Sequence, residues 1–164
     1  MSNSAHAAVP TDNEAFEMLD MLRDSAADFC RRSLEVTRLR ALRGASPAFD
    51  RKLWSEMCEL GWAGILAPEA AGGLGLGAQA VGAVCRQLGR VLAPEPMIES
   101  GVGAVAMLSA CDSATAHAML GKVIEGSSVL VCALAEDAEF ASRAPRGIEA
   151  RSANGGYVLK GEVA

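Results

Sequence analysis

Apolar residues recur every three to four positions as far as residue 125, which predicts a series of amphipathic helices. The first begins with a capping box over Thr11-Asp12-Asn13-Glu14, in which Thr11 is the N-cap and Glu14 reaches back to it. Aspartates and arginines occupy one face of this helix, and apolar side chains occupy the other. The expected buried face comprises Phe16, Leu19, Leu22, Ala26, Phe29 and Cys30.

Four more helices are predicted downstream. Ser46 and Pro47 are expected to open the second as N-cap and first helical residue. The third spans about 78–92, the fourth begins at Pro96, and Asp112 or Ser113 caps the fifth. The expected buried residues, given from the second helix to the fifth, are Phe49, Leu53, Trp54, Met57 and Leu60 in the second; Val81, Val84, Cys85, Leu88 and Leu92 in the third; Ile98, Val102, Val105 and Leu108 in the fourth; and Met119, Leu120, Val123 and Ile124 in the fifth. Five helices with short connections favour an antiparallel bundle.

A glycine-rich stretch joins the second and third helices. Gly61 is expected to be a left-handed residue that ends the second helix. Residues 62–67 are apolar without alternation, so a buried extended segment is predicted there. Gly73-x-Gly75-x-x-Ala78, with Glu95 about 20 residues on, loosely matches a dinucleotide fingerprint. No strand runs directly into Gly73 and no second parallel strand follows, so a structural turn is favoured.

The spacing of apolar residues changes near Ser128 from a helical pattern to a strand-like one. Residues 129–134 form a strand-like apolar run, 137–146 read as a loop, and Ala153-Asn154-Gly155-Gly156 predicts a hairpin turn between two short strands. The fold class is therefore mostly α, a helical bundle followed by the first strands of a β domain. The expected division is a disordered 1–10, a helical domain over 11–127 and the start of a β domain over 128–164. Three strands do not close a barrel, so we expect either a truncated product or fragment, or a partner that covers the β surface.

Composition narrows the function classes. The chain has 164 residues, a net charge of -5 and no basic run, which argues against nucleic acid as a partner. No apolar stretch is long enough to span a bilayer and no secretion signal is apparent, so a cytoplasmic protein without membrane contact is expected. Five cysteines without a CxxC pair and two distant histidines argue against a metal site. His117 is interpreted as a surface residue and Cys132 as an inert core thiol.

Several motifs together resemble the N-terminal region of the flavin-dependent acyl-CoA dehydrogenases. They are Glu59-Leu60-Gly61-Trp62, Pro68-Glu69, Gly72-Gly73-Leu74-Gly75 and Gln87-Leu88-Gly89-Arg90. The resemblance extends from about residue 14 to 162 and is strongest over 53–93. It implies a helical domain followed by a β domain, bound FAD, and oxidation of an acyl-CoA thioester to the enoyl-CoA. A glutamate would remove the α-proton while the flavin accepts the β-hydride.

The resemblance also assigns candidate residues. Residues 131–137 occupy the place of the flavin-contacting strand and loop, so Cys132, Leu134 and Ala135 are the expected cofactor-binding residues. The family pattern there is Thr-Glu-Pro followed by Gly-Ser-Asp; Ala135 lacks the flavin-bonding hydroxyl, although backbone groups at 132–135 would still serve.

On the helix that lines the acyl pocket in family members, Pro96, Ile98 and Glu99 are the expected substrate-binding residues. Glu99 would polarise the far end of that pocket, or simply provide favourable charge at a helix N-terminus. Arg38, Arg40 and Arg43 are interpreted as complementing the dipole at the end of the first helix, with CoA-phosphate contact as the alternative.

Two functions follow from the resemblance. In the first, the chain is part of an FAD-dependent acyl-CoA dehydrogenase and contributes acyl-pocket and oligomer surfaces. In the second, it is a non-catalytic helical scaffold subunit that has lost flavin chemistry. The family's catalytic glutamate belongs to a C-terminal region that is not present in these residues, so no catalytic residue is assigned. The departure at Ala135 resembles a divergent branch with heteromeric subunits, so a homo- or hetero-oligomer is expected and the isolated chain should not turn over acyl-CoA.

Overall fold

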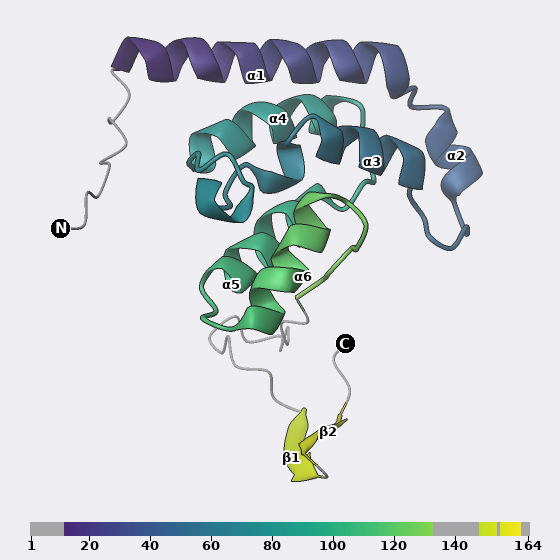
Figure 1. The fold of residues 1–164 in the computed structure, drawn as a ribbon. Helices are drawn as coiled ribbons and strands as arrows, with labels where there is room; N and C mark the ends of the chain where they lie inside the picture. Colours follow the sequence, from purple (N-terminus) through teal and green to yellow (C-terminus); the bar gives the residue numbers. More distant parts are fainter. Residues whose placement is uncertain (1–11, 133–147, 154, 162–164) are drawn as a thin grey trace, which may run out of the picture. The chain divides into compact units, whose positions relative to one another are not determined.

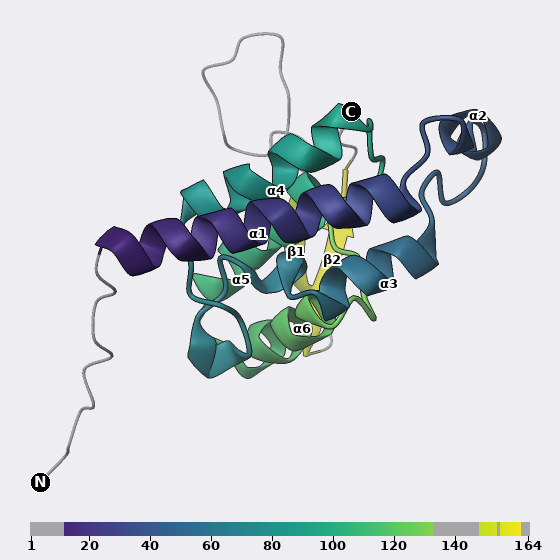
Figure 2. The same cartoon turned by 90° about the horizontal axis from the view of Figure 1, so that it is seen from above.

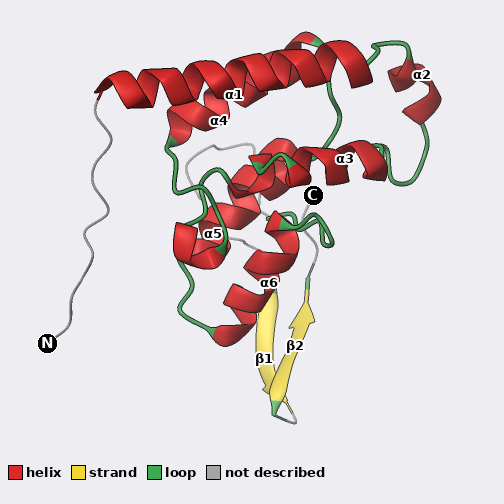
Figure 3. Cartoon of the chain, turned by 45° about the horizontal axis from the view of Figure 1, so that its top comes forward, coloured by secondary structure: helices red, strands yellow, loops and turns green. Residues whose placement is uncertain are grey.

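A computed structural model describes residues 12–132, 148–153 and 155–161 of the chain. The chain divides into two compact units, one ending at Leu130 and the other beginning at Val131. Figure 3 shows that the described part of the first unit is helical and that the second contains a hairpin. The predicted Thr11 cap, the disorder predicted for 1–10 and the loop predicted at 137–146 lie outside the described residues.

The first unit is built from α-helices joined by short turns. The α-helices are α1 (Asp12–Ser33), α2 (Arg38–Leu42), α3 (Arg51–Glu59), α4 (Ala78–Arg90), α5 (Val105–Ser109) and α6 (Ala114–Ile124). Two 3-10 helices, η1 (Trp62–Gly64) and η2 (Glu69–Ala71), precede α4, and a π-helix, η3 (Met97–Ala104), leads directly into α5. Helix α1 packs along α4, and α5 packs against α6 (Figures 1 and 2). The predicted mostly helical fold is confirmed.

The main core lies around η1, which contacts α3 and η3. Trp62 is fully buried there, and its ring meets that of Phe29 from α1 edge to face, with centroids 5.2 Å apart. The largest side chains with almost no exposure in this core are Trp54, Met57, Trp62, Ile65 and Val84. A second cluster of Ala67, Val105, Leu120 and Val123 joins α5 and α6.

Side chains that are predicted to be buried but are exposed in the structure lie mainly at helix ends. Phe16, in the first turns of α1, is 69% exposed, and Leu60, the C-cap residue of α3, is 44% exposed. Leu92 follows the end of α4 with a φ of 52° and is 63% exposed. A terminal side chain has packing neighbours on one side only, so a periodic pattern overestimates its burial.

Helix α3 begins later than the sequence pattern predicts. Its N-cap is Asp50, whose carboxylate accepts hydrogen bonds from the backbone N–H groups of Lys52 and Leu53 at 2.8 and 3.3 Å. The predicted start at Ser46 and Pro47 is wrong, because both precede the helix in a bend. Asp satisfies two of the donors that a helix start leaves free, and its charge also suits the helix dipole.

Replacing Asp50 with alanine should therefore lower the free energy of unfolding by about 1 kcal/mol, since two N–H groups lose their acceptor. Urea denaturation followed by far-UV circular dichroism measures the change. Ser46→Ala is the matched control and should change stability by less than about 0.5 kcal/mol, as expected of an exposed residue outside such features. Equal losses in the two variants would contradict the assignment of Asp50 as the cap.

The glycine-rich stretch forms a tight double turn. Gly61 has a φ of 80°, as predicted for a residue that ends a helix. The segment after it is buried but not extended as predicted: η1 forms with N–H donation from Gly64 to Gly61 and from Ile65 to Trp62. Local i+3 hydrogen bonds satisfy these buried groups without a neighbouring strand.

The glycine turn folds back on η1 through its main chain. Leu74, Gly75 and Leu76 donate their N–H groups to the carbonyls of Gly64, Ala67 and Ile65, respectively, at 2.8–2.9 Å. The N–H groups of residues 72 and 73 are likewise donated to nearby carbonyls. A dinucleotide site needs such N–H groups for phosphate, so their internal use supports the predicted structural turn.

The second unit contains the predicted hairpin. Strands β1 (Glu149–Ala153) and β2 (Gly156–Lys160) pair antiparallel, with Glu149 opposite Lys160 and Ala153 opposite Gly156. Gly155, in the turn, has a φ of 78°, which glycine adopts readily. Residues 129–132, the described part of the predicted apolar strand, are not in a strand, and residues 133–134 lie outside the described residues.

Candidate functional site

A hollow of about 260 Å³ lies between the end of α4 and the start of η3. Its lining combines apolar side chains with a substantial polar surface, which includes the exposed carboxylate of Glu99. The lining residues are Cys85, Leu88, Gly89, Ala93, Pro94, Glu95, Met97, Ile98 and Glu99. Such a surface can bind an apolar group with a polar contact at one point, but a single carboxylate does not provide acid and base partners.

The η3 helix sets which side chains face this hollow. Its π-helical register buries Met97 and Ser100 and leaves Ile98 57% exposed, so the predicted burial of Ile98 is wrong. The hydroxyl of Ser100 accepts a hydrogen bond from the Leu130 N–H at 3.2 Å. π-Helical turns carry one extra residue per turn and are frequent at functional sites.

Glu95 is held by an ion pair beside the hollow. Arg38 donates from Nη1 to Oε1 at 2.9 Å and from Nη2 to Oε2 at 2.7 Å. The Glu95 side chain is completely buried and that of Arg38 is 18% exposed. The Arg38 guanidinium is therefore engaged within the chain. The predicted place of Arg38 at the end of the first helix is wrong, because a separate helix, α2, begins at Arg38.

The cysteines near this region are not activated nucleophiles. Burial raises the pKa of Cys85, which lines the hollow, and of Cys30. Burial, with a smaller contribution from the charge of Glu59, raises the pKa of Cys58 from its ordinary 9.0 to about 12. A thiol that keeps its proton at neutral pH reacts slowly, so covalent catalysis by these cysteines is disfavoured.

Iodoacetamide at pH 8 should therefore modify the exposed Cys111 well before Cys58, as peptide mass spectrometry would measure. The unfolded Cys58 thiol ionises near pH 9 while the folded one keeps its proton to about 12. Stability should accordingly fall as pH rises through this window. In guanidinium the two cysteines should react at similar rates, and rapid modification of Cys58 in the folded chain would contradict its burial.

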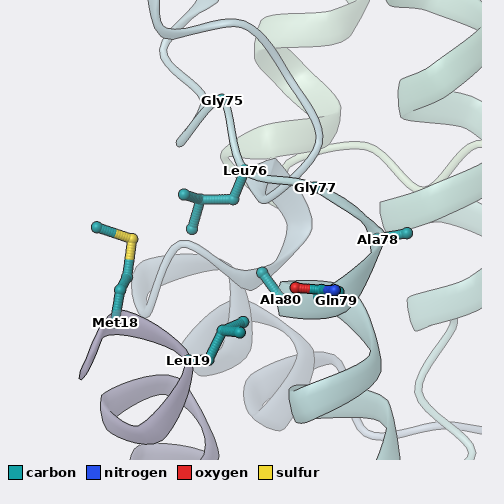
Figure 4. A pocket seen from close by; sticks show the side chains of 8 residues that line it. All are labelled: Met18, Leu19, Gly75, Leu76, Gly77, Ala78, Gln79 and Ala80. Carbon is teal, nitrogen blue, oxygen red and sulfur yellow. The ribbon is translucent and has the colours of Figure 1, made fainter. Parts of the chain in front are cut away.

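A second hollow, of about 340 Å³, lies between α1 and the glycine turn that opens α4. Met18 and Leu19 come from α1, Leu76 from the turn and Ala80 from α4, and Figure 4 shows these side chains around the hollow. Gln79 is the one polar side chain in its lining. Without a titratable group the hollow offers apolar contact but no proton transfer, so the first hollow is the better candidate site.

The structure places the predicted site residues unevenly. Pro96, Ile98 and Glu99 come together at the start of η3, and the last two line the first hollow. Cys132 is half-buried in the second unit, whereas Leu134 and Ala135 lie outside the described residues. His117 on α6 is exposed, as predicted. The substrate and cofactor roles of these residues remain predictions.

The described residues contain neither a metal-binding cluster nor a membrane-spanning helix. No group of three histidine, cysteine, aspartate or glutamate side chains there is placed to hold a metal ion. No described helix is both long and apolar enough to cross a bilayer.

Comparisons with known proteins identify the family. A model of the acyl-CoA dehydrogenase N-terminal domain matches residues 17–127, well over half of the chain. The chain belongs to the acyl-CoA dehydrogenase family. The match contains η1, the glycine turn and η3, so the first hollow lies inside the family domain.

Individual relatives agree with this assignment. The acyl-CoA dehydrogenase IpdE2 of Mycobacterium tuberculosis is 30% identical over 95 residues, which cover 57% of this chain and 30% of that protein. A variant of the Tcur3481-Tcur3483 steroid acyl-CoA dehydrogenase is 32% identical with a TM-score of 0.74, over 89% of this chain and 40% of that one. The ChsE4-ChsE5 complex of Mycobacterium tuberculosis is 26% identical with a TM-score of 0.73, and the match covers 93% of this chain and 40% of that one. The chain thus spans less than half the length of these relatives.

Proposed function

We propose that this chain supplies an acyl-pocket wall and oligomer surfaces to an FAD-dependent acyl-CoA dehydrogenase. The observation that carries the proposal is the first hollow, where Ile98 and Glu99 lie on a π-helical turn inside the matched family domain. Its apolar side chains, Ile98 among them, can contact an acyl chain, and Glu99 lies on its polar part. The proposed reaction is α,β-dehydrogenation of an acyl-CoA thioester, with Pro96, Ile98 and Glu99 as substrate-binding residues.

The residues proposed for FAD fit a backbone contact better than a side-chain contact. Cys132 is half-buried and Val131 beside it is 61% exposed, so the segment offers apolar surface and peptide groups. The family's flavin-bonding hydroxyl is replaced by the methyl group of Ala135. When bound, FAD would accept the hydride from the β-carbon of the substrate. In this proposal Cys132, Leu134 and Ala135 hold the flavin through main-chain groups and contact.

The heteromeric names of two structural neighbours support an oligomer with a second acyl-CoA dehydrogenase subunit. The decisive measurement is the visible absorption spectrum of the protein purified from its native host, taken on the peak that also gives its native mass. Flavin bands with a mass well above one chain are expected. Octanoyl-CoA and a steroid side-chain CoA thioester then serve as probes, and one of them should reduce a dye at a rate above that of free flavin.

A colourless peak without acyl-CoA-dependent dye reduction would refute this proposal. It would favour a helical scaffold subunit that kept the fold and lost flavin chemistry. Glu99→Gln and Glu99→Ala, made in the native host, should weaken binding of the reactive thioester. Glu125, an exposed acid just past α6 and outside the hollow, provides the matched control as Glu125→Gln.

A further inference from the structure

Glu95 joins three segments that are distant in sequence. Its carboxylate takes the two hydrogen bonds from Arg38 of α2, and its Oε1 also lies 3.4 Å from the N–H of Asp50, the cap of α3. Its own carbonyl accepts the N–H of Met97, the first residue of η3, at 2.7 Å. One buried residue thus connects α2 and α3 to the turn that carries Ile98 and Glu99.

Apolar packing also holds the start of η3, because Met97 is buried in the main core. Ile98 and Glu99 are exposed, whereas Met97 and Ser100 face the interior. The Ser100–Leu130 hydrogen bond holds the middle of η3, one turn further along. The paired Glu95 is therefore a polar anchor on the N-terminal side of Ile98 and Glu99, beside the packing of Met97.

Helix α2 depends on the same contact. None of its five residues is buried, so apolar packing contributes little to its docking. The two parallel Arg38–Glu95 hydrogen bonds fix both distance and orientation, which a single ammonium group does not. A buried ion pair stabilises a fold weakly relative to apolar residues of similar volume but specifies one arrangement where its geometry is satisfied.

We propose that Arg38 and Glu95 are positioning residues that set the placement of Ile98 and Glu99 at the rim of the acyl pocket. The inference about acyl-CoA rests on the proposed function. The inference that the ion pair places η3 does not rest on the proposed function, and this placement can be measured without any ligand. In this proposal neither residue contacts substrate: the Glu95 side chain has no exposed surface, and the Arg38 guanidinium is paired with it.

The first measurement is hydrogen exchange by mass spectrometry on the complex purified from its native host. Arg38→Met should speed amide exchange in the peptide 96–101 by about tenfold or more, because its anchor is lost. Peptides from α4 and α6 should keep wild-type rates. Arg23, whose ion pairs with Asp20 and Asp24 are exposed, gives the matched control as Arg23→Met, which should leave 96–101 unchanged. Unchanged exchange in Arg38→Met would overturn the proposal.

The second measurement is the Kd of the reactive thioester from the dye assay, followed by the change in flavin absorbance. Arg38→Met should weaken binding about tenfold, because the rim residues lose their fixed position. Arg38→Lys should rescue it only in part, since lysine keeps the charge and loses the bidentate geometry. The double variant Arg38→Met with Glu95→Met should recover its unfolding midpoint but not its affinity.

These readouts separate the two proposals. A wild-type complex that binds neither flavin nor thioester refutes the proposed function, while the exchange rates still decide whether the ion pair positions η3. An Arg38→Met complex with faster exchange and unchanged Kd overturns the role at the acyl pocket. Affinity that recovers together with stability in the double variant also overturns it, because the ion pair would then act through stability alone.

Discussion

Replacing Gly73 with alanine is expected to lower the free energy of unfolding by about 3 kcal/mol, the upper end of the range for overpacked sites. A Cβ atom at this position would overlap the carbonyl oxygen of Ala67 and lie 2.5 Å from its carbonyl carbon. The obstacle is main chain, so a side-chain rotation cannot relieve it. The neighbouring N–H of Gly75 donates to that same carbonyl, and moving Ala67 would break the bond. Urea denaturation followed by far-UV circular dichroism measures the loss.

Gly82 provides the matched control. It lies in the interior of α4, is exposed, and a Cβ atom there would meet nothing within 4 Å. Gly82→Ala should raise the free energy of unfolding by about 0.5–1 kcal/mol, because alanine favours the helix. A loss below about 0.5 kcal/mol in Gly73→Ala would contradict the close approach between the glycine turn and η1.

The periodic parts of the fold are predictable from sequence because their cause is local. The α4 positions Val81, Val84 and Leu88 recur at helical spacing, and all three are buried. Gly61 also follows a local rule, since a left-handed residue is needed just past a helix. The start of α3 is not settled by local rules alone. Asp50 is a favoured N-cap, but Ser46-Pro47 is an equally good local signal four residues earlier.

The site depends on contacts that are not local, and these are not predictable from the pattern. Glu95 and Arg38 lie 57 positions apart, so the sequence offers no signal that pairs them. Glu95 stood out only as the acidic residue that a dinucleotide fingerprint would require. The π-helical register of η3 similarly exposes Ile98, which is predicted to be buried, and buries Met97 instead. An ordinary helical period places Ile98 inside, and only the packing of the whole unit shows which one is buried.

The 3-10 turn at Trp62 also depends on contacts that are not local. An apolar run of six residues is compatible with a buried strand or a buried turn, and periodicity does not separate them. The deciding contacts are the N–H groups of residues 74–76, which satisfy carbonyls of residues 64–67 from across the glycine turn. The sequence motifs around Trp62 indicate the family, whereas the 3-10 conformation of the backbone is known only from the structure.

Trp62→Ala is expected to lower the free energy of unfolding by about 3–5 kcal/mol, the range for truncating a buried tryptophan. The side chain is fully buried, and its loss would leave a cavity among α1, α3 and η3 and remove the edge contact with Phe29. Trp62→Phe should cost less than half as much. Among the described residues the Trp62 Nε1 has no hydrogen-bond partner, so phenylalanine removes a buried polar group that is unsatisfied there while keeping an aromatic ring against Phe29. Equal losses in the two variants, measured by the same denaturation, would mean that the indole N–H stabilises the core, against the packing described here.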